Sequence, residues 1–267
     1  MFTWDVDPVL FHIAAFPVRY YTLLFIAVFV GGFFPLRWQI VRGGGTRDDA
    51  IDITIYTMVA VLVGSRLGHV LYYDLDRALV DPLWVLQFWQ GGLSSHGATV
   101  GILVMLFIVG RRRRVSFVEA CDRITFSVAI GATLVRVGNF INSEIVGRLT
   151  DQNWGVRFPR YDRIAEPPLR HPSQLYEVAL GLAVLAALVL LDRRCGREQR
   201  PRGLMISTFF AAYFTGRFIV ELFKEYQTLS PSSALTMGQY LSIPFALLGY
   251  YGLYWSLTRK RPAGWRQ

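Results

Sequence analysis

Residues 124–142 read ITFSVAIGATLVRVGNFIN, and this stretch decides what kind of protein the chain is. Its first twelve residues, up to Val135, carry no charge, and Arg136 follows within the same run. A charged side chain inside a membrane span costs roughly 2.5–3.5 kcal/mol even on a lenient insertion scale. Arg136 therefore indicates an anionic partner, or a wet cavity, inside a membrane protein.

Apolar runs of similar length recur along the whole chain of 267 residues, which is 53% hydrophobic. About 20 such residues cross the roughly 30 Å hydrocarbon core of a bilayer as a helix. Seven runs are visible, at residues 18–38, 50–73, 93–109, 117–140, 175–191, 204–223 and 238–257. We expect an all-α polytopic membrane protein, with about seven transmembrane helices bundled into a single domain over 1–267. Residues 141–172 are the longest polar stretch and predict a small periplasmic cap.

Basic residues are concentrated in alternate loops, after the first, third, fifth and seventh runs, at 37–47, 111–114, 193–202 and 259–266. The positive-inside rule places all four loops in the cytoplasm, and therefore the N-terminus outside and the C-terminus inside. The net charge of +9 could suggest nucleic acid, but this distribution is typical of topology signals that touch anionic lipid. We expect membrane lipids and no nucleic acid as partners.

The opposite ends of the runs carry polar residues that topology does not explain. Residues 91–97 read GGLSSHG and lead into the third run, where Ser94 or Ser95 can cap the helix. A glycine-rich turn before a helix can bind an anion, although plain turn chemistry is the commoner reading. Arg66 and His69 share one face of the second run.

The fourth, fifth and sixth runs add further polar residues. Arg136, Asn139 and Ser143 share one face if the helix continues that far, and the alternative for Arg136 is a structural pair with a glutamate of a neighbouring helix. Residues 171–177 read HPSQLYE, whose Gln174 and Glu177 enter the fifth run. In the sixth run, Arg217 and Glu221 are spaced i, i+4 and can simply pair with each other.

Arginines in three separate runs, with few embedded acids, favour an anionic ligand at lipid depth. A phospholipid head group fits best, because the arginine fork binds phosphate through two hydrogen bonds. Two other classes remain open. A lipid or anion transporter would also line a cavity with arginine, and a non-catalytic scaffold would pair each embedded charge within the protein.

The strings GGLSSHG at 91–97, RVGNFINSE at 136–144 and above all HPSQLYE at 171–177 resemble the bacterial prolipoprotein diacylglyceryl transferases, as does Gly216-Arg217 with Glu221. The resemblance covers nearly the whole chain. It implies an inner-membrane enzyme, with its active site in the outer half, that transfers the diacylglyceryl group of phosphatidylglycerol to the lipobox cysteine of a prelipoprotein. The products would be a thioether and glycerol 1-phosphate. No cofactor is implied, and the chain lacks the Cys/His spacing typical of a metal site.

The motif match also assigns roles to residues. His96, Arg136 and Arg217 would be catalytic, the arginines facing the lipid phosphate. The resemblance further matches five family positions: Tyr21, Asn139, Glu144, Gly147 and Glu221. Together with these, we predict a substrate-binding set that includes residues of the same strings and faces: Arg66, Ser94, Ser95, Gly97, Asn142, Arg148, His171, Gln174, Tyr176 and Glu177. The chain departs mildly from the family pattern at Thr22, Ala98, Ser143, Val146 and Lys224, which bears on rate and substrate preference more than on the reaction.

Two mechanisms remain open for the removal of the proton from the attacking thiol. A cysteine thiol has an ordinary pKa of about 8.5, so a base or a positive field is needed at neutral pH. Imidazole is the natural base, because its ordinary pKa is about 6.5, and His96 would take the proton. Alternatively, the arginines lower the pKa of the thiol and His96 only positions lipid.

Overall fold

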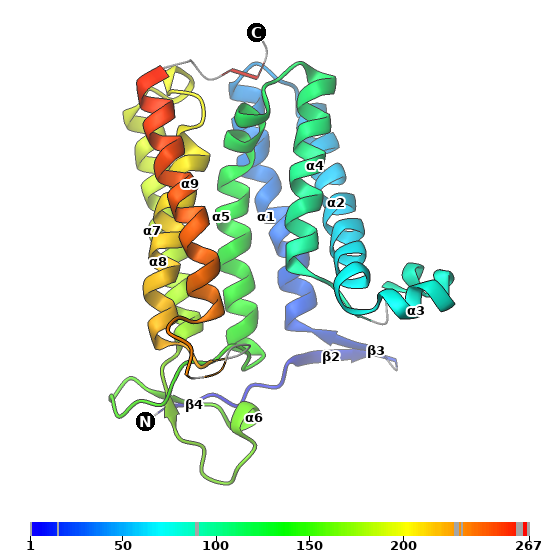
Figure 1. Cartoon of the computed structure of the whole chain (residues 1–267), viewed down its shortest axis with the longest axis vertical. Helices are drawn as coiled ribbons and strands as arrows, with labels where there is room; N and C mark the ends of the chain where they lie inside the picture. Colours follow the sequence, from blue (N-terminus) through cyan, green and yellow to red (C-terminus); the bar gives the residue numbers. More distant parts are fainter. Residues whose placement is uncertain are drawn as a thin grey trace. The chain divides into compact units, whose positions relative to one another are not determined.

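The computed structural model describes residues 2–14, 16–88, 91–226, 230, 232–259 and 264–265, so most of the basic cluster at 259–266 lies outside them. Within these residues, each of the seven predicted runs coincides with a long helix (Figure 1). These helices are α1 (Tyr20–Arg42), α2 (Arg47–Tyr73), α4 (Ser95–Arg113), α5 (Phe117–Ile141), α7 (Ser173–Arg194), α8 (Leu204–Val220) and α9 (Met237–Arg259). The shorter helices are α3 (Leu75–Val80), α6 (Pro159–Asp162), η1 (Pro82–Leu86), η3 (Arg197–Gln199) and η4 (Glu221–Phe223).

Five helices of the described chain are long and apolar enough to cross a membrane: α1, α2, α5, α7 and α8 continued to Phe223. The mean hydropathy of α4 is lowered by His96 near its start and by the arginines of its last turn. That of α9 is lowered by its tyrosines and glycines. The predicted class, an all-α polytopic membrane protein, is confirmed, while the number of spans stays a prediction.

The chain divides into two compact units. The first comprises Met1–Pro35 and Ile124–Ala263, and the second comprises Leu36–Arg123 and Gly264–Gln267. Helices α1 and α5 each contribute residues to both units. The single domain expected from the sequence stays a prediction.

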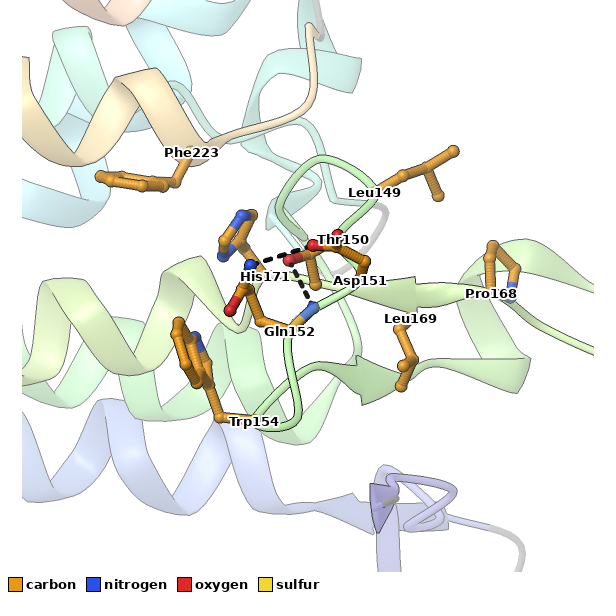
Figure 2. Close-up of a pocket in the computed structure, with 9 residues that line it drawn as sticks. All are labelled: Leu149, Thr150, Asp151, Gln152, Trp154, Pro168, Leu169, His171 and Phe223. Carbon is orange, nitrogen blue, oxygen red and sulfur yellow. Dashed lines mark hydrogen bonds between the residues drawn. The ribbon is translucent and has the colours of Figure 1, made fainter.

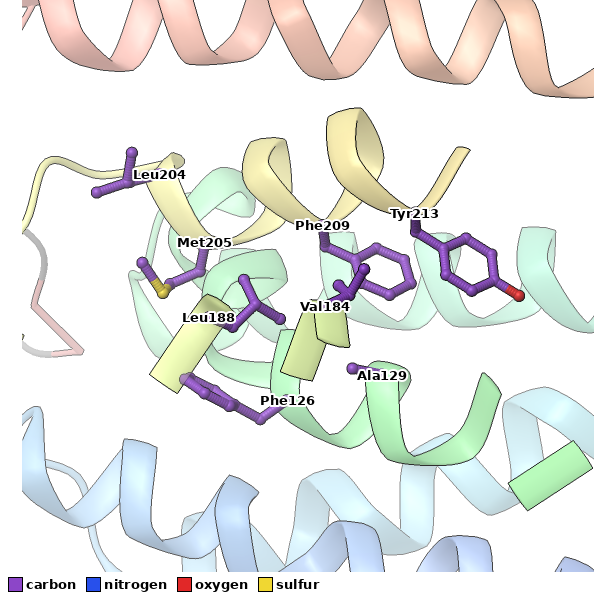
Figure 3. Close-up of a cluster of buried hydrophobic side chains, with 8 residues drawn as sticks. All are labelled: Phe126, Ala129, Val184, Leu188, Leu204, Met205, Phe209 and Tyr213. Carbon is purple, nitrogen blue, oxygen red and sulfur yellow. The ribbon is translucent and has the colours of Figure 1, made fainter. Parts of the chain in front are cut away.

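The core of the first unit lies among helices α5, α7 and α8, with α9 packed against α8 (Figure 1). Figure 3 shows the side chains of α8 facing those of α5 and α7 in this core. The buried cluster consists of Phe126, Ala129, Val184, Leu188, Leu204, Met205, Phe209 and Tyr213. Because lipid tails are as apolar as these side chains, close packing rather than escape from water holds the helices together.

The second unit is built on the crossing of α2 and α4. Gly64 and Gly68 of α2 face Gly97 and Gly101 of α4, and a Cβ added at Gly68 would lie only 2.6 Å from the Cα of Gly97. Small residues at this spacing let two membrane helices bring their backbones together. The crossing therefore fixes the first turn of α4 against α2.

The polar stretch at 141–172 folds mainly as short strands and turns. Strand β4 (Val156–Arg157) pairs in parallel with β1 (Phe2–Thr3) and antiparallel with β5 (Leu169–Arg170). A separate hairpin joins β2 (Val9–Ile13) to β3 (Phe16–Arg19). The cap predicted at 141–172 thus includes the N-terminal strand, and its periplasmic location stays a prediction.

The sequence left open whether the helix of Arg136 continues as far as Ser143. The helix ends at Ile141, so Ser143 does not continue the face of Arg136 and Asn139. Ser143 and Ile145 instead have φ angles of 55° and 54°, in the left-handed region. A β-branched residue rarely adopts this conformation, and such strain persists where the surroundings enforce it. The turn between α5 and the cap is therefore held by its neighbours.

Candidate functional site

A chain of ion pairs connects the ends of three helical segments in the first unit. The Nε of Arg136 lies 3.2 Å from one oxygen of Glu177, whose other oxygen lies 3.1 Å from Nζ of Lys224. Lys224 also contacts Glu221 at 2.7 Å, and Glu221 lies 3.9 Å from Arg217. We call these five residues the charge network.

The charge network is mostly buried and carries one more positive than negative charge. Glu177, Glu221 and Lys224 are buried, while Arg217 is the most exposed member, with 24% of its side chain accessible. Arg217 also makes the longest of the ion pairs. A buried excess charge is unfavourable without an anion, so the network is suited to bind one on the side of Arg217.

Amide and hydroxyl groups surround Arg136. Its Nη1 donates to Oδ1 of Asn139 at 3.2 Å, and Tyr213 is another hydrogen-bond partner. Asn139 in turn donates to Glu144 at 3.3 Å. Tyr21 lies close to Gly138, and it interacts electrostatically with both Arg136 and Glu144. Four of the predicted substrate-binding or catalytic residues thus lie together.

The strained turn after α5 presents the exposed carboxylate of Glu144. Asn142 donates to its second oxygen at 3.2 Å, and Gln174 donates to its backbone carbonyl at 2.7 Å. Ser173 donates to the carbonyl of Ile145 at 3.0 Å. These bonds account for the left-handed residues, because they hold the turn against the start of α7.

Backbone contacts tie this turn to the segment that carries Lys224. The N–H of Gly147 donates to the carbonyl of His171, and that of Arg148 donates to the carbonyl of Phe223. The Nε of Arg148 donates to the carbonyl of Lys224 at 2.9 Å. A Cβ at Gly147 would lie 2.6 Å from Cβ of His171, so only glycine allows this approach. Gly147 and Arg148 therefore position Lys224 for the charge network.

An aromatic cluster adjoins this junction. The indole N–H of Trp154 donates to the hydroxyl of Tyr176 at 3.0 Å, and that hydroxyl lies 3.1 Å from Nδ1 of His171. Since the hydroxyl oxygen accepts from Trp154, its own proton is free to bond an unprotonated Nδ1. Burial lowers the pKa of His171, and the nearby Asp151 carboxylate opposes this shift. His171 is therefore neutral at physiological pH and can donate from Nε2.

A cavity of about 790 Å³ opens beside this cluster (Figure 2). Trp154, His171 and Phe223 line it together with the turn that carries Asp151 and Gln152. Gln152 is bonded to the side chains of Asp151 and Thr150, so this polar wall is ordered. The remaining lining residues, Leu149, Pro168 and Leu169, are apolar. The cavity offers both apolar surface and hydrogen-bonding groups.

The second unit places five predicted residues together: Arg66, Ser94, Ser95, His96 and Gly97. Ser94 caps α4, since its hydroxyl accepts from the N–H of Gly97 at 3.3 Å, and the prediction of this cap is confirmed. His96 is exposed at the second position of the helix. Arg66 is buried, and backbone carbonyls accept its hydrogen bonds. The structure therefore gives Arg66 protein partners where the sequence suggested an anionic ligand.

The sequence missed several members of the site. Lys224 was noted only as a departure from the family pattern, although its spacing from Glu221 and Arg217, i+3 and i+7, predicts a shared helical face. Tyr213 and Trp154 carry no local signal, because their partners come from distant segments. The other predicted residues of the first unit lie in the charge network or in the segments that hold it.

Breaking the charge network is expected to destabilise the protein. Glu177→Gln removes the anion that Arg136 and the buried Lys224 share, and we expect a loss of about 3–5 kcal/mol in the free energy of unfolding. Thermal unfolding in detergent measures it, with Glu166→Gln, an exposed cap carboxylate, as the control. The double variant Glu177→Gln/Lys224→Met should recover a large part of the loss. Equal losses in the single and double variants would contradict the coupling.

Comparison with known proteins identifies the family. The profile of the prolipoprotein diacylglyceryl transferases matches residues 8–255. The chain is similar to the phosphatidylglycerol–prolipoprotein diacylglyceryl transferase of Geobacter sulfurreducens, with 37% identity over 91% of this chain and 93% of the relative. The enzyme of the same name from Pseudoalteromonas atlantica is 35% identical over 97% of this chain and 92% of its own length. The one from Vibrio cholerae is 36% identical over 96% of this chain and 93% of its own length. The chain belongs to the prolipoprotein diacylglyceryl transferase family.

Proposed function

We propose that this protein transfers the diacylglyceryl group of phosphatidylglycerol to the lipobox cysteine of prolipoproteins. The observation that carries the proposal is the charge network, a buried group with one excess positive charge at the end of membrane helices. A phosphodiester lipid brings one negative charge to that depth. The family membership and the names of the relatives support the same reaction.

The proposed step is a displacement at carbon. The cysteine sulfur attacks the glycerol carbon that bears the phosphate ester, and a C–S bond forms as the C–O bond breaks. The oxygen keeps the electron pair and leaves as glycerol 1-phosphate, while the thiol proton passes to a base. Arg136 and Arg217 stabilise the charge that develops on the leaving phosphate, an effect that is large where water is excluded.

Two explanations remain for how the cysteine thiol loses its proton. His96 is exposed at the start of α4, where a substrate can reach it. The excess positive charge of the network supports the alternative, in which the field lowers the pKa of the thiol.

We place the site in the outer half of the bacterial inner membrane, with the N-terminus periplasmic and the C-terminus cytoplasmic. The reason is that the basic loops alternate along the chain.

We assign the acceptor peptide to the cavity beside His171. It combines apolar walls with polar side chains, and Phe223 connects it to the segment of Glu221 and Lys224. We expect Leu149→Glu to raise the KM for a lipobox peptide about tenfold, which corresponds to about 1.4 kcal/mol. The KM for phosphatidylglycerol should be unchanged. Ile164→Glu is the matched control, since Ile164 is an exposed cap residue outside the cavity lining. Equal effects of both variants would exclude this assignment.

The test of the function uses purified protein, phosphatidylglycerol and a synthetic lipobox peptide. We expect mass spectrometry to find a diacylglyceryl addition on the peptide cysteine, with one glycerol phosphate released for each peptide modified. A peptide with serine in place of cysteine should remain unmodified. Movement of lipid between leaflets without a covalent product would favour a transporter. If neither a covalent product nor lipid movement is found, a structural scaffold remains as the explanation.

A further inference from the structure

Arg66 makes an unusual set of contacts for an arginine in a membrane helix. Its Nε donates to the carbonyl of Val85 at 2.9 Å, its Nη2 to that of Trp84 at 2.7 Å and its Nη1 to that of Gly91 at 2.7 Å. A longer contact of 3.4 Å reaches the carbonyl of Gly92. All three guanidinium nitrogens thus bind backbone, and Arg66 is only 1% exposed.

The planar face of the guanidinium is covered as well. The Cζ atom of Arg66 lies 4.2 Å from the centre of the Trp84 ring, and Trp84 is itself buried. A phosphate binds arginine through two parallel hydrogen bonds along the edge of the fork. Because carbonyls occupy those edges, a lipid phosphate would have to displace the backbone at 84–85 and 91–92 to bind here.

The turn that Arg66 holds has little freedom. Gly91 and Gly92 both have positive φ angles, of 83° and 71°. A Cβ at Gly92 would lie 2.6 Å from the ring of His69 and 2.9 Å from Nη1 of Arg66. By contrast, nothing lies within 4 Å of the position a Cβ would take at Gly91. The inner side of the turn is therefore packed on α2 and its outer side is open.

The chain is fixed a second time immediately before His96. The N–H of Ser94 donates to the carbonyl of Ser65 at 2.9 Å, and the Ser94 hydroxyl caps the helix. Ser65 and Arg66 are consecutive residues of α2. Two adjacent positions of one helix thus hold the turn on both sides of Leu93, three residues before His96.

We infer that Arg66 is a positioning residue, which fixes the turn at 91–95 and thereby the location of His96, and that it does not bind the lipid phosphate. This inference rests on the proposed function only for the role of His96. Loss of the clamp moves the imidazole relative to its substrate, and a displacement of about 1 Å can cost about 10²-fold in rate.

Arg66→Lys is the first test, because an ammonium on a flexible stem cannot hold three carbonyls in a planar fork. We expect kcat to fall about 10²-fold while the KM for phosphatidylglycerol and the inhibition by inorganic phosphate stay unchanged. Arg77→Lys is the matched control, since Arg77 stacks on the same Trp84 ring at 4.3 Å. A raised KM with an unchanged kcat, or weaker phosphate inhibition, would overturn the inference and return Arg66 to the phosphate site.

Hydrogen exchange gives a readout that does not require the proposed reaction. We expect backbone amides at 84–88 and 91–97 to exchange faster in Arg66→Lys than in the wild type, with no change in α7 or α8. The pair Gly92→Ala and Gly91→Ala separates the clamp from backbone strain, because both glycines have positive φ. Gly92→Ala should reproduce the Arg66→Lys pattern more strongly than Gly91→Ala. Unchanged exchange in Arg66→Lys would exclude the clamp, whether or not the purified enzyme transfers lipid.

Discussion

Replacing Arg136 by glutamine is expected to abolish thioether formation while the protein still inserts and folds. Arg136 supplies the excess positive charge of the network, so its removal leaves Arg217 and Lys224 balanced by Glu177 and Glu221. The neutral network remains stable but no longer attracts an anionic lipid. Losing one donor to a developing oxyanion costs about 10²–10³-fold, and we expect at least that reduction in kcat/KM.

The measurement is peptide modification by the purified variant, with thermal unfolding to confirm the fold. Arg160→Gln serves as the control, because Arg160 is a partly exposed cap arginine that pairs with Asp5. It should transfer lipid at the wild-type rate. Normal thioether formation by Arg136→Gln would show that the phosphate is bound elsewhere.

The second large effect is expected at His96. General bases contribute about 10²–10⁴-fold, and His96→Gln should lower kcat by that factor if the imidazole accepts the thiol proton. The plot of rate against pH should also lose one of its limbs. Because His96 is exposed at the beginning of α4, we expect the unfolding temperature to be unchanged.

The control for this variant is His12→Gln, which alters an exposed histidine of the N-terminal hairpin. It should keep both the rate and the pH profile of the wild type. A slow His96→Gln enzyme with an unaltered pH profile would favour the other mechanism, in which the arginine field activates the thiol. Full activity would remove His96 from the reaction.

Local signals in the sequence predicted the helices well. The run at 117–140 matches α5 within one residue at its C-terminal end, because apolar length alone defines a membrane helix. Ser94 was predicted as a cap, since capping depends on residues adjacent in sequence. Whether Ser143 shares the face of Arg136 could not be decided from the sequence, because hydrogen bonds from α7 hold the strained turn and no local pattern contains them.

The partners within the site could be predicted only in part. The spacing of Arg217 and Glu221 indicated a pair, but Glu221 bonds Lys224 more closely. The position of Arg66 on a membrane helix suggested a ligand, whereas residues at 84–85 and 91 supply backbone carbonyls instead. Charge at lipid depth thus predicts that a partner exists, while only the tertiary fold determines whether that partner is substrate or protein.

The glycine crossing of α2 and α4 has a consequence for lipid traffic. Backbones that leave no room for one methyl group between Gly68 and Gly97 leave none for an acyl chain. At this crossing the two helices are therefore closed, and a two-tailed substrate and its lipidated product must pass elsewhere.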